Sequence, residues 1–269
     1  MSAARAVPVL MYHHVSPNPG LVTVSPVAFR SQMEAVIAHG YRAVAADDLL
    51  AFLQKRKKLP AKSVLITFDD GYLDNYVYAY PVLKELGLRA TIFAITGWIG
   101  DGPVRGGEPP CPDHKTCMAK VRDGQADEVM LRWSEIEAME AAGVVEFHSH
   151  THTHTRWDKT LADPAARRAA LAQDLAQSRD TLRERLGREE RHLCWPQGYF
   201  DDNYVTVARE QGFEALYTTR RHVNTRRTSP LDIGRIVTKE RGGDWLARRL
   251  AIYSSPMLGR LYTALRGDK

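Results

Sequence analysis

The sequence predicts an α/β protein in which a parallel sheet curls into a barrel. Three observations support this fold class. Short apolar segments that suit buried strands alternate along the 269 residues with segments of helical periodicity, which is typical of a parallel sheet. About eight such strand segments are present, which favours a barrel over an open sheet. No internal repeat or long linker divides the chain, so we expect one large domain.

One apolar segment, Ser63 to Phe68, organises the rest and ends on Asp69, Asp70 and Gly71. Such a run suits a strand that is covered on both faces. Neighbouring side chains on a regular strand point to opposite faces, so the two aspartates can share a site only if the chain turns there. Gly71 permits that turn at the C-terminal end of the strand, where α/β proteins place their chemistry. The alternative is that the aspartates only cap the next helix.

The other strands and helices follow from the same patterns. The expected strands are Val7 to Tyr12, Tyr41 to Ala45, Val64 to Phe68, Ala90 to Ile95, Val144 to Phe147, Arg191 to Trp195, Phe213 to Thr219 and Ile233 to Thr238. Ser25 as N-cap and Pro26 as first residue begin a helix that ends at Gly40. Asp163 and Pro164 begin the longest helix, which ends at Gly187.

The segment from about Gly97 to Asp127 departs from this alternation. It is rich in Gly, Pro and charge, and we interpret it as an insertion at the mouth of the fold, where such loops shape substrate access. Cys111 and Cys117, with His114 between them, could form a metal or disulfide loop, although a fourth metal ligand is not evident. The three cysteines of the chain fit a reducing compartment.

Four histidines at a spacing of two follow the strand that ends near Phe147: His148, His150, His152 and His154. In a parallel sheet they lie at the same mouth as Asp69 and Asp70. Two imidazoles and a carboxylate form a good divalent-metal site that leaves positions open for water and substrate. Both 148/152 and 150/154 fit His-[Ser/Thr]-x-x-His, so this pattern alone does not choose between them.

Thr67-Phe68-Asp69-Asp70-Gly71 together with His-[Ser/Thr]-x-x-His resembles the polysaccharide deacetylase (NodB-homology) family of metal-dependent sugar N- and O-deacetylases. The resemblance extends from about Pro8 to about Thr238. The stretch from Pro8 to His14 resembles the opening of the branch that includes poly-N-acetylglucosamine deacetylases. The family implies a distorted (β/α) barrel, commonly of seven strands.

The resemblance also implies roles for the motif residues. Asp69 would be the general base that deprotonates the attacking water, and Asp70 a metal ligand. The family's second motif aligns best with His150 and His154 as the other ligands, which leaves His148 and His152 outside the metal site. It implies one divalent ion, with zinc preferred over other first-row metals.

Cys194-Trp195-Pro196-Gln197-Gly198 resembles the third family motif. There the backbone N–H after the proline, here that of Gln197, helps to hold the oxyanion. Cys194 replaces the arginine that normally orients the base, so another group must fix Asp69. The general acid is not evident: His222 is a weak candidate, with which His13 and His14 compete. We expect the substrate to contact His13, His14, Tyr72, Trp195 and Pro196.

Charge and composition narrow the partners. The net charge of +5 and the pI of about 9.1 are too small and scattered for a nucleic-acid footprint, so no nucleic-acid partner is expected. Eight basic and three acidic residues lie between Arg235 and Lys269, so this stretch carries a net charge equal to that of the whole chain. The start of the chain lacks the features of a signal peptide, which predicts a cytoplasmic protein.

The C-terminal segment suggests a membrane surface. We expect a barrel over residues 1–243 and a basic amphipathic segment over 244–269, split at Pro256. Its apolar residues, at helical spacing among arginines, are Trp245, Leu246, Leu250, Tyr253, Met257, Leu261 and Leu265. That composition suits a helix on the anionic inner face of the cytoplasmic membrane, or equally helices that pack on the barrel.

The family resemblance implies a metal-dependent deacetylase that acts on an N-acetylhexosamine, and the C-terminal segment favours a lipid-linked sugar or glycan precursor at the cytoplasmic membrane face as its substrate. A poly-N-acetylglucosamine-type polymer is the alternative substrate. A non-catalytic sugar-binding barrel is a rival, favoured by the missing arginine and the missing late histidine. A glycosidase is disfavoured because its paired carboxylates flank the scissile bond from separate strands, roughly 5–9.5 Å apart.

Overall fold

A computed structural model describes residues 2–266 of the chain, and the statements below concern these residues. The charges predicted at Asp268 and Lys269 lie outside the described residues.

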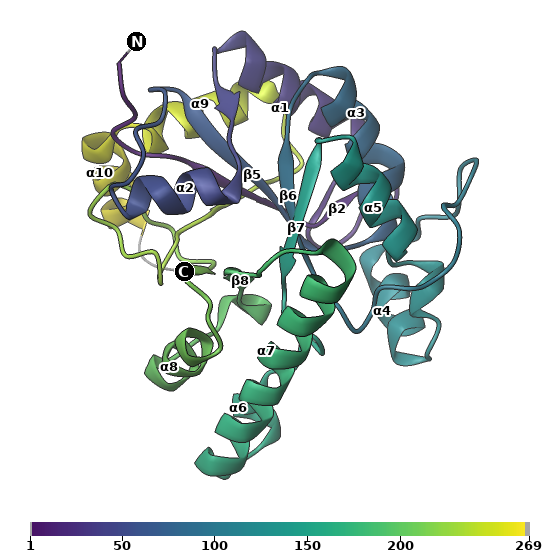
Figure 1. Ribbon diagram of the computed structural model, residues 1–269. Coiled ribbons are helices and arrows are strands. Elements are labelled where there is room, and N and C mark those ends of the chain that lie inside the picture. The colour runs from purple at the N-terminus through teal and green to yellow at the C-terminus, as the bar shows by residue number, and fades with distance from the viewer. Residues whose placement is uncertain (1, 267–269) are drawn as a thin grey trace.

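Seven parallel strands form the main sheet in the order β10-β1-β5-β6-β7-β8-β9 (Figure 1). The strands are β1 Val9–Tyr12, β5 Ser63–Asp70, β6 Ala90–Ala94, β7 Val145–Ser149, β8 His192–Cys194, β9 Ala215–Tyr217 and β10 Ile236–Val237. A further strand, β4 Arg42–Ala43, pairs with the start of β5. Two short strands, β2 His14–Val15 and β3 Thr23–Val24, form a separate parallel pair. The predicted distorted barrel of about seven strands is confirmed.

The helices connect these strands and cover the outside of the sheet (Figure 1). They are α1 Pro26–Ala38, α2 Ala46–Leu53, the π-helix η1 Asn75–Ala79, α3 Tyr80–Glu85, α4 His114–Arg122, the 3₁₀-helix η2 Ala126–Glu128, α5 Trp133–Ala141, α6 Trp157–Thr160, α7 Pro164–Leu186, the 3₁₀-helix η3 Pro196–Gly198, α8 Asp202–Glu210, α9 Gly243–Tyr253 and α10 Pro256–Arg266. The N-cap expected of α1 is present, because the Ser25 side chain accepts a hydrogen bond from the Ala28 amide, and the helix ends at Ala38, two residues before the expected Gly40. Asp163 caps α7 in the same way, and Gly187 ends it in a left-handed conformation.

A short segment closes the barrel. Tyr217 of β9 forms a bridge with Ile233, and three residues later β10 pairs with β1, where Ile236 lies opposite Leu10. The segment 233–237 therefore contacts both edges of the sheet. Because closure depends on so few residues, the barrel is distorted rather than regular.

Buried apolar residues fill the barrel below its C-terminal end. Leu65, Phe93 and Tyr217 point inward from the strands and cluster with Leu49 and Phe52 of α2. A second cluster lies between the outer face of the sheet and the helices α1, α3, α5 and α9. Since the interior is packed, a ligand can enter only at the C-terminal ends of the strands, as in other barrels of this kind.

The two C-terminal helices differ in their packing. In α9, Leu246, Leu250 and Tyr253 are buried, and the helix packs on α1, where a Cβ on Gly243 would lie 2.4 Å from the Ser31 carbonyl oxygen. In α10, the exposed apolar residues are Met257, Leu258, Leu261 and Leu265. The first half of the tail is thus part of the barrel core, whereas the second half presents an apolar face to solvent. Within residues 2–266, no helix is both long and apolar enough to cross a membrane.

Candidate active site

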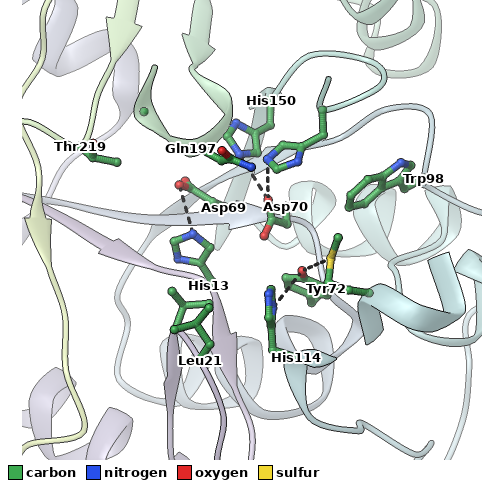
Figure 2. A pocket seen from close by; sticks show the side chains of 14 residues that line it. His13, Leu21, Asp69, Asp70, Tyr72, Trp98, His114, His150, Gln197 and Thr219 are labelled. Carbon is green, nitrogen blue, oxygen red and sulfur yellow. Dashed lines mark hydrogen bonds and ion pairs between the residues drawn. The ribbon is translucent and has the colours of Figure 1, made fainter. Parts of the chain in front are cut away.

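A pocket of about 390 Å³ opens at the C-terminal ends of β1, β5, β7 and β8 (Figure 2). Its volume lies within the range of about 300–1,000 Å³ that is usual for ligand sites. The lining residues come from widely separated parts of the chain and are His13, Leu21, Val22, Asp69, Asp70, Tyr72, Trp98, His114, Met118, His150, His154, Gln197, Gly198 and Thr219. The parallel sheet has brought the aspartate motif and the histidine motif to one place.

The adjacent carboxylates Asp69 and Asp70 face the same pocket because the strand ends in an unusual conformation. Asp70 has a φ of 76° and Gly71 a φ of 85°. A positive φ is costly for a non-glycine residue and is often retained at functional sites. The expected turn after the strand is present, and Asp70 as well as Gly71 takes part in it.

Asp69 is held by an arginine that the motif comparison missed. The guanidinium of Arg235 donates from Nη1 to Oδ1 at 2.6 Å and from Nη2 to Oδ2 at 2.8 Å. Both side chains are buried, and Arg235 Nε also donates to the Thr218 carbonyl oxygen at 2.9 Å. This two-pronged contact fixes the plane of the carboxylate, which is the task the missing third-motif arginine would perform.

The charge of Arg235 also sets the protonation of Asp69. Burial by itself raises the pKa of this carboxyl, but the nearby guanidinium outweighs burial, so the pKa lies below its usual value. Asp69 is therefore ionised at neutral pH and can accept a proton. His13 lies beside it, with Nε2 3.8 Å from Oδ2.

Asp70, His150 and His154 form a compact group of potential metal ligands, since one ligand atom from each lies within 4.8 Å of the others. His150 Nε2 is 3.3 Å and His154 Nε2 is 3.6 Å from Oδ1 of Asp70. His150 Nδ1 donates to the Cys194 carbonyl oxygen at 2.8 Å, which leaves Nε2 free to coordinate. Oδ1 of Asp70 is buried without a hydrogen-bond partner among the described residues. A divalent cation would satisfy this oxygen, so the group fits a metal.

A second candidate group, formed by Asp69, His150 and Cys194, fits a metal less well. The carboxylate of Asp69 is already paired with Arg235. Burial raises the pKa of the Cys194 thiol, whereas a metal ligand must be the thiolate. The group around Asp70 is the better metal site.

The loop 150–155 is not helical, yet it brings two imidazoles together. Thr151 and His154 both have positive φ, at 67° and 58°, and the ring centroids of His150 and His154 are 4.9 Å apart. The buried carboxylate of Asp174, on α7, accepts hydrogen bonds from the amides of His152 and Thr153 and from Nε1 of Trp157. Asp174 thus anchors the loop 150–155, a role that the sequence analysis does not predict.

The third motif supplies a backbone donor at Gln197, which lies beside His150 in the pocket (Figure 2). Gln197 has a φ of 56°, and its amide makes no hydrogen bond to another backbone group among residues 2–266. Gly198 follows with a φ of 67°, and a Cβ there would lie 2.2 Å from Oγ1 of Thr219. Only glycine allows this close approach, which brings Gly198 against Thr219 in the pocket lining.

Three of the residues expected to contact the substrate do not line the pocket. His14 is buried behind Tyr72, with Nδ1 bonded to Asp74 and Nε2 bonded to His114, so it does not line the pocket. Trp195 and Pro196 are also buried, and the Trp195 ring packs on Phe200 and Tyr204. His13 and Tyr72 do line the pocket.

The weak general-acid candidate, His222, is likewise outside the pocket. Its Nε2 lies 3.4 Å from Oδ1 of Asp232. The second histidine pair is not near Asp70 either: His148 bonds to Glu190, and His152 bonds to Thr96. Of the four histidines in the run, only His150 and His154 reach the pocket.

The insertion lies at the mouth of the barrel and contributes Trp98, His114 and Met118 to the pocket. Cys111 and Cys117 are both free and buried. Instead of joining them in a metal loop, His114 faces the pocket.

Comparisons with known proteins identify the family to which the chain is related. The family profile described as polysaccharide deacetylase matches residues 56–216. Bacillus subtilis YxkH is 45% identical over 93 residues, which make up 35% of this chain and only 33% of that protein, so the chain spans about a third of its length. The poly-beta-1,6-N-acetyl-D-glucosamine N-deacetylase of Staphylococcus aureus is 25% identical over 229 residues, 84% of this chain and 71% of that protein.

A solved structure extends the likeness over the whole barrel. IcaB from Ammonifex degensii superposes with a TM-score of 0.71 at 27% identity, over 93% of this chain and 97% of that one. The chain belongs to the polysaccharide deacetylase family. The family resemblance expected from the motifs is confirmed. The expected enzyme class, a carbohydrate deacetylase that acts as a hydrolase, is confirmed as well.

Proposed function

We propose that the protein is a metal-dependent N-deacetylase that hydrolyses the acetamide of an N-acetylhexosamine and releases acetate. The observation that carries this proposal is the pair of carboxylates with separate environments. Asp69 is held ionised by Arg235, while the adjacent Asp70 faces His150 and His154 in the same pocket. One carboxylate is thus available for proton transfer and the other for metal binding.

Asp70, His150 and His154 would hold the metal, for which we propose zinc. When bound, such an ion polarises the acetamide carbonyl and acidifies water. Asp69 takes a proton from the attacking water, with its carboxylate kept in plane by Arg235. The Gln197 amide donates to the oxygen that becomes negatively charged as the water adds to the carbonyl.

His13 is our candidate for delivering a proton to the departing amine, in place of His222. It lines the pocket, and its Nε2 is 3.8 Å from Oδ2 of Asp69. Burial lowers the pKa of His13, so the resting ring is neutral and can relay the proton that Asp69 takes from water. His13→Asn should lower kcat and leave the metal content unchanged.

For the substrate, the relatives support an N-acetylglucosamine polymer. The Staphylococcus aureus relative is a poly-beta-1,6-N-acetyl-D-glucosamine N-deacetylase and aligns with 84% of this chain. We therefore propose a poly-N-acetylglucosamine-type glycan as the preferred substrate of this protein.

The deciding experiment is acetate release from a β-1,6-linked N-acetylglucosamine oligosaccharide by the metal-loaded protein. Release that stops with a chelator and returns with added zinc supports the proposal. Binding of the oligosaccharide without any release would favour a sugar-binding barrel. Appearance of new reducing ends without acetate would favour a glycosidase.

A second candidate is a sugar presented at a membrane, including a lipid-linked one, and α10 is the observation that favours it. Its exposed apolar residues include Met257 at 74% and Leu261 at 59% exposure. A hollow beside this helix is lined by Arg221, Lys239 and Arg249, which suits anionic headgroups. That the protein meets the membrane on its cytoplasmic face stays a prediction.

Co-sedimentation with vesicles of anionic phospholipid tests this second candidate. Met257→Gln with Leu261→Gln should reduce binding, whereas Val27→Gln, which removes an apolar residue of α1 that is 81% exposed, should not. Binding of the wild-type protein should weaken with salt. No binding by the wild-type protein, or equal binding by both variants, would contradict it.

A further inference from the structure

Three side chains form a hydrogen-bonded chain that runs from the core into the pocket. Asp74 Oδ2 lies 2.5 Å from Nδ1 of His14, and Nε2 of His14 lies 3.1 Å from Nδ1 of His114. Asp74 and His14 are only 2% and 1% exposed, whereas His114 is half-buried and lines the pocket. None of the catalytic steps proposed above uses these groups.

At the buried end of this hydrogen-bonded series, the contacts of Asp74 define which atoms donate and which accept. Asp74 Oδ1 accepts hydrogen bonds from the Val15 amide and from Nδ2 of Asn75, and Oδ2 accepts from the His14 ring. In the tautomer in which His14 Nδ1 donates to Asp74, His14 Nε2 accepts from His114 Nδ1, and Nε2 of His114 is left as an acceptor.

The position of His114 is also fixed by its surroundings. The His14 ring stacks on Tyr72 with centroids 3.7 Å apart, and the Tyr72 hydroxyl lies 3.4 Å from His114 Nδ1. Asn18 Nδ2 donates to the Cys111 carbonyl oxygen at 2.7 Å, which ties the loop that carries Leu21 to the insertion that carries His114. Such supported side chains are suited to specific recognition.

We propose that His114 is a substrate-binding residue whose Nε2 accepts a hydrogen bond from a hydroxyl of the sugar undergoing deacetylation. Nδ1 is occupied by His14 and Tyr72, so Nε2 is the ring nitrogen available to a ligand. In Figure 2, His114 lies on the opposite side of the pocket from His150, with Asp70 between them. A sugar whose acetamide reaches Asp70 therefore presents its ring hydroxyls towards the insertion. This inference rests on the proposed function.

Replacing His114 should weaken sugar binding while leaving the metal site intact. For His114→Ala we expect KM to rise roughly 5- to 10-fold, as for loss of one neutral hydrogen bond, with kcat, its pH profile and the zinc content unchanged. Lys115→Ala is the matched control, because Lys115 is the exposed neighbour on the same helix. His14→Phe keeps a ring against Tyr72 and removes the support of His114, so combining it with His114→Ala should add little.

The partner hydroxyl is found with β-1,6-linked N-acetylglucosamine oligosaccharides that lack one hydroxyl at a time. Their equilibrium binding is measured in the Asp69→Asn background, so that this readout does not depend on turnover. One deoxy position should weaken binding by the variant with intact His114 and have no effect once His114 is replaced.

The outcomes separate this inference from the proposed function. No acetate release by the metal-loaded wild-type protein would overturn the proposed function, while the binding comparison would still test His114. Normal acetate release combined with equal KM and equal binding in His114→Ala would overturn the role of His114. A fall in kcat or zinc content without a change in KM would show a purely structural role and overturn it as well.

Discussion

Two neighbouring aspartates can perform different tasks because their surroundings differ. Asp69 is bound by Arg235, and Asp70 faces two imidazoles. We predict that Asp69→Asn keeps zinc and loses turnover by roughly 10²-fold or more, as for loss of a general base. Asp70→Asn and His150→Ala should lose zinc and activity together. Metal analysis and acetate release check this, with His152→Ala as the control that retains both.

The division of labour would be contradicted by equal zinc loss in the Asp69 and Asp70 variants. The choice of ligands would be wrong if His148→Ala removed the metal while His150→Ala and His154→Ala were silent.

Arg235 should control the acid limb of the pH–rate profile. Its guanidinium lowers the pKa of Asp69 against the effect of burial, so weakening the contact should raise that pKa and shift the acid limb to higher pH. Arg235→Lys keeps the charge but cannot make both hydrogen bonds. We expect this variant to retain zinc, to lose activity and to show the shifted limb in kcat/KM.

Arg235→Ala serves as the harsher comparison. It leaves the buried Asp69 carboxylate unpaired, which should cost about 3–5 kcal/mol of the free energy of unfolding. An unchanged pH profile in Arg235→Lys would show that the arginine does not set the protonation of Asp69.

At the scale of elements, the ligand loop depends on a helix. Asp174 of α7 accepts hydrogen bonds from two backbone amides of the loop that carries His154 and from the indole of Trp157. We predict that Asp174→Asn, which replaces one acceptor oxygen by a donor, weakens zinc affinity about 10- to 100-fold. Competition with a coloured chelator measures this. Asp180→Asn, at a position on the same helix whose side chain is 46% exposed, should leave the affinity unchanged, and equal affinities in the two variants would contradict the anchoring role.

The elements that carry the motifs could be predicted because their signals are local. The apolar run of β5 ends at its carboxylates, and the caps of α1 and α7 lie within a few residues of each helix. Arg235 had no such signal: it directly precedes the two-residue strand β10, and the sequence analysis groups it with the basic C-terminal stretch. Its contact spans 166 residues, so only tertiary structure reveals it. Asp174 and His14 were missed or misplaced for the same reason.

At the scale of the whole molecule, the chain buries a second ionisable cluster beneath the site. His148 Nδ1 lies 2.9 Å from Oε1 of Glu190, and the rings of His148 and His192 are 4.4 Å apart. Nε2 of His192 continues the network to Asp47 of α2 at 2.9 Å. This cluster joins strands and helices that are distant in sequence, so its protonation should affect the stability of the barrel rather than catalysis.

Glu190 gives this cluster a testable dependence on pH. Burial raises the pKa of Glu190 to about 7, against 4.5 for an ordinary glutamate. The folded state therefore holds its proton more tightly than the unfolded state does, and this stabilisation is fully present below about 4.5 and is lost as the pH rises through 7. Glu190→Gln cannot titrate, so its stability relative to the wild type should increase by roughly 3 kcal/mol between pH 4.5 and pH 8. Denaturant unfolding across this range measures the difference, with Glu189→Gln as the exposed control of equal charge change. A difference that is constant with pH would mean that Glu190 is ionised in the folded protein, as the partner of a charged His148.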